Sequence, residues 1–205
     1  SVRVQDHITK VSLEGVCAIL GSCARLRALD GVTAPAFDAA MWRVSRSGFQ
    51  LKPAHLGHLA LAFARWLPVS QLHTDFGDHL QDEVLDGSKV AAFFTSTLRP
   101  AVLREASAFA DPKHLAFTVM ALVHAGCRTR EEVAPLEALA AKLVRAQQSP
   151  TDSLRWSRFE GQSLAILAEA FARLFENSAD VTMASDGGSA GHIDDMSRSL
   201  IQHLT

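Results

Sequence analysis

Two groups of histidines have the spacing at which side chains bind metals or transfer protons. His55 and His58 are three residues apart in a segment with helical apolar periodicity, so one turn of a helix carries both imidazoles. Zinc takes about four ligands, and no Cys or carboxylate follows at a metal-motif spacing. We therefore expect polar side chains beside an apolar stripe here, and we predict no metal site.

A second group of titratable residues lies between positions 73 and 83. Its members are His73, Asp75, Asp78 and His79, followed by Asp82 and Glu83. Metal binding or acid–base chemistry is conceivable for such a set. Leu72, Phe76 and Leu80 already define the buried side of the same expected helix, which favours a solvated polar face.

Covalent chemistry has little basis in the sequence. Cys17 and Cys23 lie six residues apart in one expected helix, so we expect buried, inert thiols, and Cys127 follows a turn glycine without a catalytic partner. The stretch 186–189 (DGGS) lacks the Lys and the preceding strand of a phosphate-binding loop. We predict that the chain is no enzyme, with no catalytic residue, no cofactor and no small-molecule substrate.

Arginines beside aromatic residues are the remaining candidates for function. Arg155 and Arg158 flank Trp156 in the sequence RWSRF. Single-stranded RNA is bound by such residues, and protein interfaces favour the same types. The chain has 20 basic and 22 acidic residues and a net charge of −2, which favours a protein interface over a phosphate backbone.

Composition and length restrict the fold. The chain has 205 residues, of which 48% are hydrophobic, and the apolar residues recur with helical spacing almost throughout. We predict one all-α domain over residues 1–205. No apolar run approaches 18 residues, so no membrane span is expected. Three cysteines do not make a disulfide framework, which favours a reducing compartment.

An internal repeat organises the chain. The segments 12–26, 52–66, 111–125 and 160–174 align when one basic position is superposed: Arg25, Arg65, His124 and Arg173. Two apolar columns then coincide: Val16, Leu56, Leu115 and Leu164, and Ile19, Leu59, Thr118 and Leu167. We predict that the leucines of these columns are buried. Further columns hold mostly small residues, which let a neighbouring helix approach closely.

Each aligned helix is followed by a second amphipathic stretch. These stretches are 35–47, 70–85, 131–147 and 192–204. The predicted units are therefore about 12–47, 52–86, 111–147 and 160–204, with an inserted helical segment at 88–110 that Pro100 interrupts. The expected architecture is a short right-handed α-solenoid of antiparallel helix pairs, about four pairs with one extra helix.

The aligned helices resemble those of organellar helical-repeat proteins. LGHLALAFARW (56–66) and LAILAEAFARL (164–174) are similar to octotricopeptide and heptatricopeptide repeats and to the leucine-rich region of FAST-kinase-like proteins. More distantly, they resemble pentatricopeptide repeats. The resemblance implies a mitochondrial location on the matrix side, with plastid or cytoplasm as alternatives.

Two functions follow from that resemblance. The first is a non-enzymatic scaffold that binds protein subunits of a large mitochondrial assembly, such as the ribosome or ATP synthase. The alternative is an organellar RNA-binding protein that acts in RNA processing or translation. In both cases the candidate interface or RNA contacts are Arg25, Arg65, Arg173, Arg155, Trp156 and Arg158.

Overall fold

A computed structural model describes residues 10–26, 33–46, 51–64, 91–126, 130–178 and 191–204. Every regular element in these ranges is helical, which confirms the all-α prediction. The α-helices are α2 (Leu13–Leu26), α3 (Thr33–Arg46), α4 (Pro53–Ala64), α6 (Arg99–Glu105), α7 (Pro112–His124), α8 (Arg130–Gln148), α9 (Gly161–Ser178) and α10 (Gly191–Leu204). Three short elements accompany them: the π-helix η2 (Phe94–Leu98) and the 3-10 turns η3 (Ala106–Ala108) and η4 (Trp156–Arg158).

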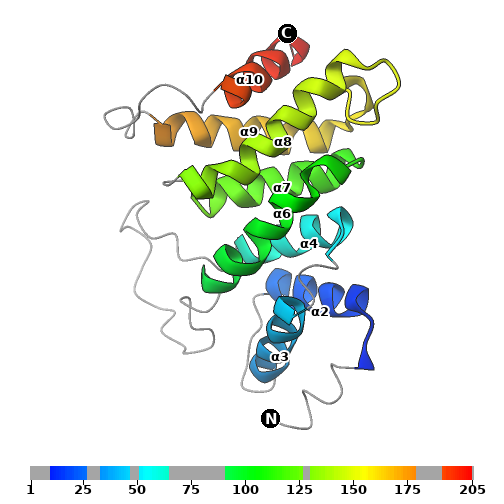
Figure 1. Ribbon diagram of the computed structural model, residues 1–205, viewed down its shortest axis with the longest axis vertical. Coiled ribbons are helices and arrows are strands. Elements are labelled where there is room, and N and C mark those ends of the chain that lie inside the picture. Colours follow the sequence, from blue (N-terminus) through cyan, green and yellow to red (C-terminus); the bar gives the residue numbers. More distant parts are fainter. Residues whose placement is uncertain are drawn as a thin grey trace.

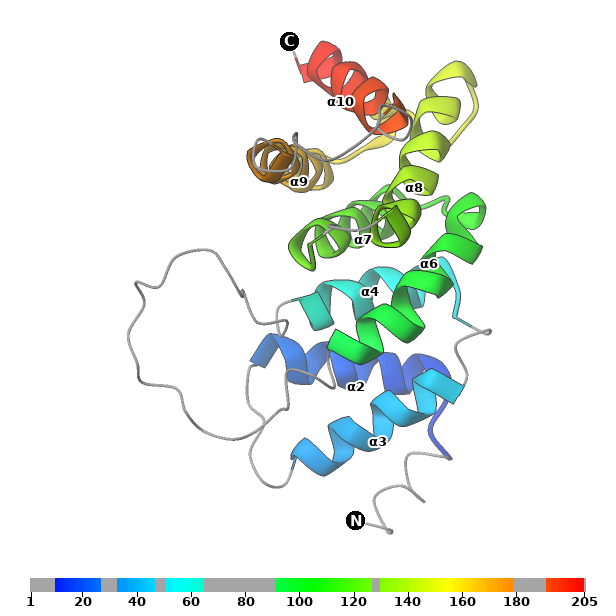
Figure 2. The ribbon, with the colours of Figure 1, turned by 60° about the vertical axis from the view of Figure 1, so that its left-hand side comes forward.

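The helices form two layers (Figures 1 and 2). Helices α2, α4, α7 and α9 each pack on the next, in that order, and we call them the A layer. The B layer consists of α3, the helical run from η2 through α6 to η3, α8 and α10; α3 packs on α2, the run packs on α4, and α10 packs on α8. The A layer therefore contains the four helices that the repeat alignment superposes.

The N-terminus of α7 shows why the chain becomes helical where it does. Asp111 has an extended backbone, and its carboxylate accepts hydrogen bonds from the N–H groups of Lys113 (2.8 Å) and His114 (3.2 Å). Those donors have no partner within the helix, and Pro112 occupies a position where a missing N–H is harmless. The helix ends before Gly126, whose φ of 81° is the left-handed conformation that glycine adopts readily.

The aligned leucines lie in the core between the layers. Leu56, Leu59, Leu115 and Leu167 are fully buried, as predicted. Leu164 is only half-buried. This difference agrees with the position of α9, because no further A-layer helix follows it in the described part of the chain.

The described part of the inserted segment predicted at 88–110, residues 91–110, lies in the B layer. Phe94, Leu98 and Val102 are buried, and the run packs between α4 and α8. It is irregular: the π-helix η2 leads into α6 at Pro100, which has no N–H to donate to the preceding turn. The amphipathic stretch predicted at 70–85 lies outside the described residues.

Glycine allows a close contact between α4 and α7 in the A layer. A Cβ atom on Gly57 of α4 would lie 2.9 Å from both the Cα and the carbonyl oxygen of His114 in α7. Backbone atoms cannot move aside as a flexible side chain does, so α4 and α7 approach this closely only because position 57 lacks a side chain. Among the described helices, none is both long and apolar enough to cross a membrane.

Candidate protein-interaction surfaces

Trp156, a predicted contact residue, is buried in the core of the chain. Its side chain is only 5% exposed, and its indole Nε1 donates to Ser199 Oγ of α10 at 2.9 Å. Its backbone N–H donates to Gln147 Oε1 of α8 at 3.0 Å. A tryptophan between two arginines has the pattern of an exposed contact residue. The sequence alone does not show that Gln147 of α8 and Ser199 of α10 satisfy the two N–H groups of Trp156. Arg155 is half-buried and Arg158 is exposed.

The basic column of the repeat brings two of its members together. Arg173 Nη1 of α9 lies 3.4 Å from His124 Nδ1 of α7, and its Nη2 forms an ion pair with Glu169 Oε1 at 2.7 Å. The Arg173 charge is therefore partly neutralised by its own helix, which weakens it as a phosphate contact. The side chain of Arg25 and the whole of Arg65 lie outside the described residues.

The first histidine group is divided between two environments. His55 Nδ1 accepts a hydrogen bond from the N–H of Lys52 at 3.3 Å, and burial lowers the pKa of His55. His58 lies edge-on to His114 of α7, with ring centroids 5.1 Å apart. In the described ranges no three His, Cys, Asp or Glu side chains gather as a metal site. The group at 73–83 lies outside them.

Cys17 has the environment of a structural thiol. It is buried in α2, and burial, followed by the charge of Glu14, raises its pKa to about 12. A thiol with such a pKa remains protonated at neutral pH and is a poor nucleophile. The side chains of Cys23 and Cys127 lie outside the described residues.

Arg99 is a buried cation that ties the inserted segment to the α7–α8 turn. It is 5% exposed, and its Nη1 lies 2.8 Å from Glu132 Oε1 of α8. Its guanidinium carbon lies 5.6 Å from the centre of the Phe94 ring, and its Nη2 donates to the Gly126 carbonyl. Among the described residues, Arg99 Nε and Nη1 make no hydrogen bond, so Nη1 meets Glu132 as an ion pair only. This group is a structural joint, because its charge is compensated within the protein.

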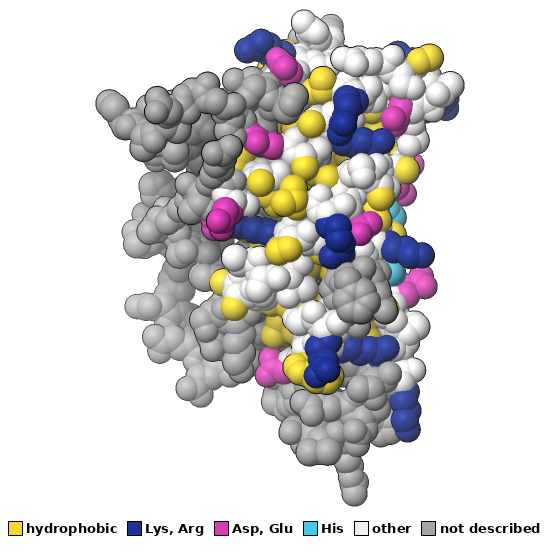
Figure 3. Space-filling model, viewed as in Figure 1, with side chains coloured by type: hydrophobic (Ala, Val, Ile, Leu, Met, Phe, Trp, Pro, Cys, Tyr) yellow, Lys and Arg dark blue, Asp and Glu magenta, His cyan; other side chains and the backbone are white. Residues whose placement is uncertain are grey.

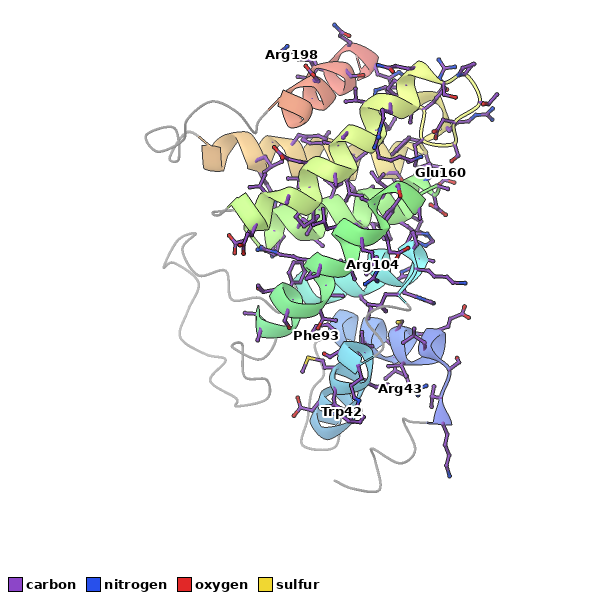
Figure 4. All side chains as sticks on the ribbon, in the orientation of Figure 1. Trp42, Arg43, Phe93, Arg104, Glu160 and Arg198 are labelled. Atoms are coloured by element: carbon purple, nitrogen blue, oxygen red, sulfur yellow. The ribbon has the colours of Figure 1, made fainter. Side chains whose placement is uncertain are left out.

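An exposed tryptophan lies on α3 at one end of the B layer. Trp42 is 48% exposed, and the guanidinium of Arg46 lies 5.0 Å above the centre of its ring. Arg43 lies on the same helix (Figure 4). We call Trp42, Arg43 and Arg46 the α3 cluster. Aromatic and arginine side chains are the residue types enriched where proteins bind proteins.

The sequence contained a signal for this cluster. Trp42 and Arg46 are four residues apart, so they share a helix face that is separate from the apolar stripe of Phe37, Met41 and Val44. The RWSRF segment has a more conspicuous pattern of the same residue types, but its tryptophan is buried.

Among the described residues, the cations of the B layer do not form a continuous basic surface. In Figure 3, Lys and Arg side chains form separate groups, with Asp or Glu beside several of them and hydrophobic side chains between. Arg104 on α6 pairs with Glu105 at 2.9 Å, Lys142 on α8 with Asp152 at 3.7 Å, and Arg198 on α10 with Asp195 at 3.8 Å. Figure 4 shows Arg104 between Trp42 at one end and Arg198 at the other. This mixed surface suits a protein partner better than a phosphate backbone.

Comparison with protein-family models, with curated proteins and with solved structures finds no match for this chain.

Proposed function

We propose that the chain is a non-enzymatic helical-repeat scaffold that binds other protein subunits. The observation that carries the proposal is the α3 cluster: Trp42 is half-exposed on α3 of the B layer, and Arg46 stacks on its ring. A large aromatic side chain without a role in the core loses favourable burial unless a partner covers it. The paired charges along the rest of the B layer support a protein partner.

The finer architecture is part of this proposal. The A layer and the B layer together support a right-handed α-solenoid of antiparallel helix pairs, in which each A-layer helix is joined to a B-layer helix. Such arrays present long surfaces built from equivalent positions on successive helices. The proposed assembly is mitochondrial, with the ribosome and ATP synthase as the two assemblies that the family resemblance favours.

Purification of the tagged chain from its native source tests the proposal. We expect defined protein subunits to remain bound after ribonuclease treatment, and Trp42→Asp to release them. Lys113→Ala is the matched control, because Lys113 stacks on Phe117 of the A layer at 5.8 Å, outside the α3 cluster. Ribosomal RNA in a sample that is not treated with ribonuclease, or ATP-synthase subunits, identify the assembly. If Trp42→Asp and Lys113→Ala both retain every subunit, the α3 cluster is not the interface.

RNA binding is the second candidate function, and the same cluster supports it. A base stacks on an exposed aromatic ring, and an adjacent arginine contacts the phosphate. Arg46 is exposed and stacks on Trp42, whereas Arg173, a contact predicted from the repeat, pairs with Glu169. An RNA-binding role therefore requires that Arg46→Ala weaken RNA binding more than Arg173→Ala does.

A further inference from the structure

Burial within the A layer follows the same pattern at successive junctions. At the α4–α7 junction, Gly57 of α4 meets the backbone of His114 in α7, so position 57 faces the following helix and position 114 faces the preceding one. We call these sides of an A-layer helix its later face and its earlier face. The repeat alignment transfers both faces to the other A-layer helices.

The later face is buried on α2, α4 and α7, each of which is followed by another A-layer helix. On α4 it includes Gly57 and Ala60, and both are buried. The equivalent residues of α2 and α7 are buried as well: Cys17, Leu20, Ala116, Val119 and Val123.

On α9 the same face is open. Its residues are Ala165, Ala168 and Ala172; Ala165 and Ala172 are exposed, and Ala168 is half-buried. Helix α10, which follows α9, packs chiefly on α8 in the other layer. In the described part of the chain, the A layer therefore ends at α9 with a face of small side chains, equivalent to the faces that receive another helix at the preceding junctions.

The earlier face shows the reverse pattern. Its central column is fully buried in Leu59, Thr118 and Leu167, each of which belongs to a helix with a predecessor. The equivalent residue of α2 is Ile19, which is 37% exposed. Its neighbour Ala18 is also exposed. A large aliphatic side chain is thus partly exposed at the opposite end of the layer, at the position whose equivalents are fully buried in the other A-layer helices.

The two open faces are complementary, and we propose that a second copy of this chain docks end to end, with α2 of one copy on α9 of the other. Ile19 then lies against the alanine face of α9. In the alignment, Ile19 is equivalent to Leu167, which belongs to the face of α9 that meets the later face of α7. The A layer continues across the contact with the same pairing of faces. Because the two faces differ, the contact is heterologous, and each copy retains one open end.

Sedimentation of the full 205-residue chain over a range of concentrations tests the proposal. The contact involves one helix from each copy, so we expect weak association, with midpoints on the order of 10 to 100 micromolar. Ile19→Asp blocks one end and Ala172→Arg blocks the other. Each variant should associate at least about tenfold more weakly than the unmodified chain, since every copy then lacks the same face.

Mixing the two variants gives the decisive result. The intact α9 face of Ile19→Asp meets the intact α2 face of Ala172→Arg, so an equimolar mixture forms a dimer that does not extend. Leu103→Asp is the matched control, because Leu103 is 47% exposed on α6, outside both faces, and it should leave association unchanged. Circular dichroism confirms that the exposed substitutions leave the fold intact.

Three results would overturn the proposal. The first is an unmodified chain that stays monomeric at about 200 micromolar, well above the expected midpoint. The second is normal association of either variant on its own. The third is a mixture that remains monomeric while the unmodified chain associates.

Discussion

Arg173 Nη1 of α9 lies 3.4 Å from His124 Nδ1 of α7, and the two residues share one position in the sequence alignment of the A-layer helices. The alignment superposes them at a separation of 49 residues. Their contact shows that equivalent positions of α7 and α9 are neighbours in space, as expected for stacked helices. It also shows that two members of the basic column make a contact within the protein.

Truncation of a buried column residue should destabilise the fold strongly. Leu59→Ala and Leu167→Ala remove fully buried side chains, so each should lower the free energy of unfolding by about 2–5 kcal/mol. Ile19→Ala is the control from the same column, and its exposed side chain should lose less than about 1 kcal/mol. Urea denaturation measures all three. Equal losses for Leu59 and Ile19 would contradict the placement of this column.

Two glycines should respond in opposite directions to the same substitution. Gly57→Ala places a methyl group 2.9 Å from the His114 backbone, and the resulting overpacking should cost about 1–3 kcal/mol in unfolding free energy. Gly21→Ala meets no atom within 4 Å, so the better helix propensity of alanine should stabilise α2 by up to about 1 kcal/mol. Thermal melting of the pair provides the comparison. Stabilisation by Gly57→Ala would show that α4 and α7 are farther apart than described.

The buried ion pair should be costly to break from one side. Glu132→Gln leaves the Arg99 charge without its counter-ion, and we expect a loss of roughly 2–3 kcal/mol in unfolding free energy. The loss lies below that for a fully buried pair, because the Glu132 side chain is 30% exposed. Arg99→Met removes the buried charge, so no counter-ion is required, and it should lower the free energy of unfolding by less than Glu132→Gln does. Glu131→Gln alters an exposed neighbour and serves as the control.

Cys17 should be protected from thiol reagents while the chain is folded. In a variant with Cys23 and Cys127 replaced by serine, maleimide at pH 8 should label Cys17 at least about a hundredfold faster in urea than in buffer. Rapid labelling of the folded chain would contradict the burial of α2.

The Cys17 pKa also sets a direction for the pH dependence of stability. The pKa is raised from 9.0 to about 12 in the folded state, so the unfolded chain binds fewer protons above pH 9. The free energy of unfolding should therefore fall as the pH rises from about 9 towards 12. Cys17→Ala should lack this part of the fall in a series of urea denaturations. An identical alkaline slope in both proteins would show that the thiol ionises freely in the fold.

The repeat positions could be predicted from the sequence because they depend on local periodicity. Leu59 and Leu167 lie in amphipathic segments whose apolar face is evident within a few turns. Their burial requires only that such faces meet. The open end at Ile19 was not predicted, since the alignment treats all four helices as equivalent and contains no information on which of them lacks a neighbour.

Contacts between distant segments could not be predicted in this way. Trp156 is buried because Gln147 and Ser199, which are 9 and 43 residues away, satisfy its two N–H groups. Without those partners a tryptophan between two arginines has the pattern of a surface residue. For Trp42 the opposite holds. It follows a core methionine in the sequence but is exposed, and its exposure depends on the helices that surround α3.

The measurement that separates the scaffold from an RNA-binding protein is a titration of the chain with single-stranded organellar RNA at two salt concentrations. The scaffold proposal predicts weak binding that is lost at about 150 mM salt and does not depend on sequence, because the B-layer cations are dispersed and several are paired with carboxylates. Sub-micromolar, sequence-dependent affinity that persists at about 150 mM salt would contradict the scaffold proposal and identify the chain as an RNA-binding protein.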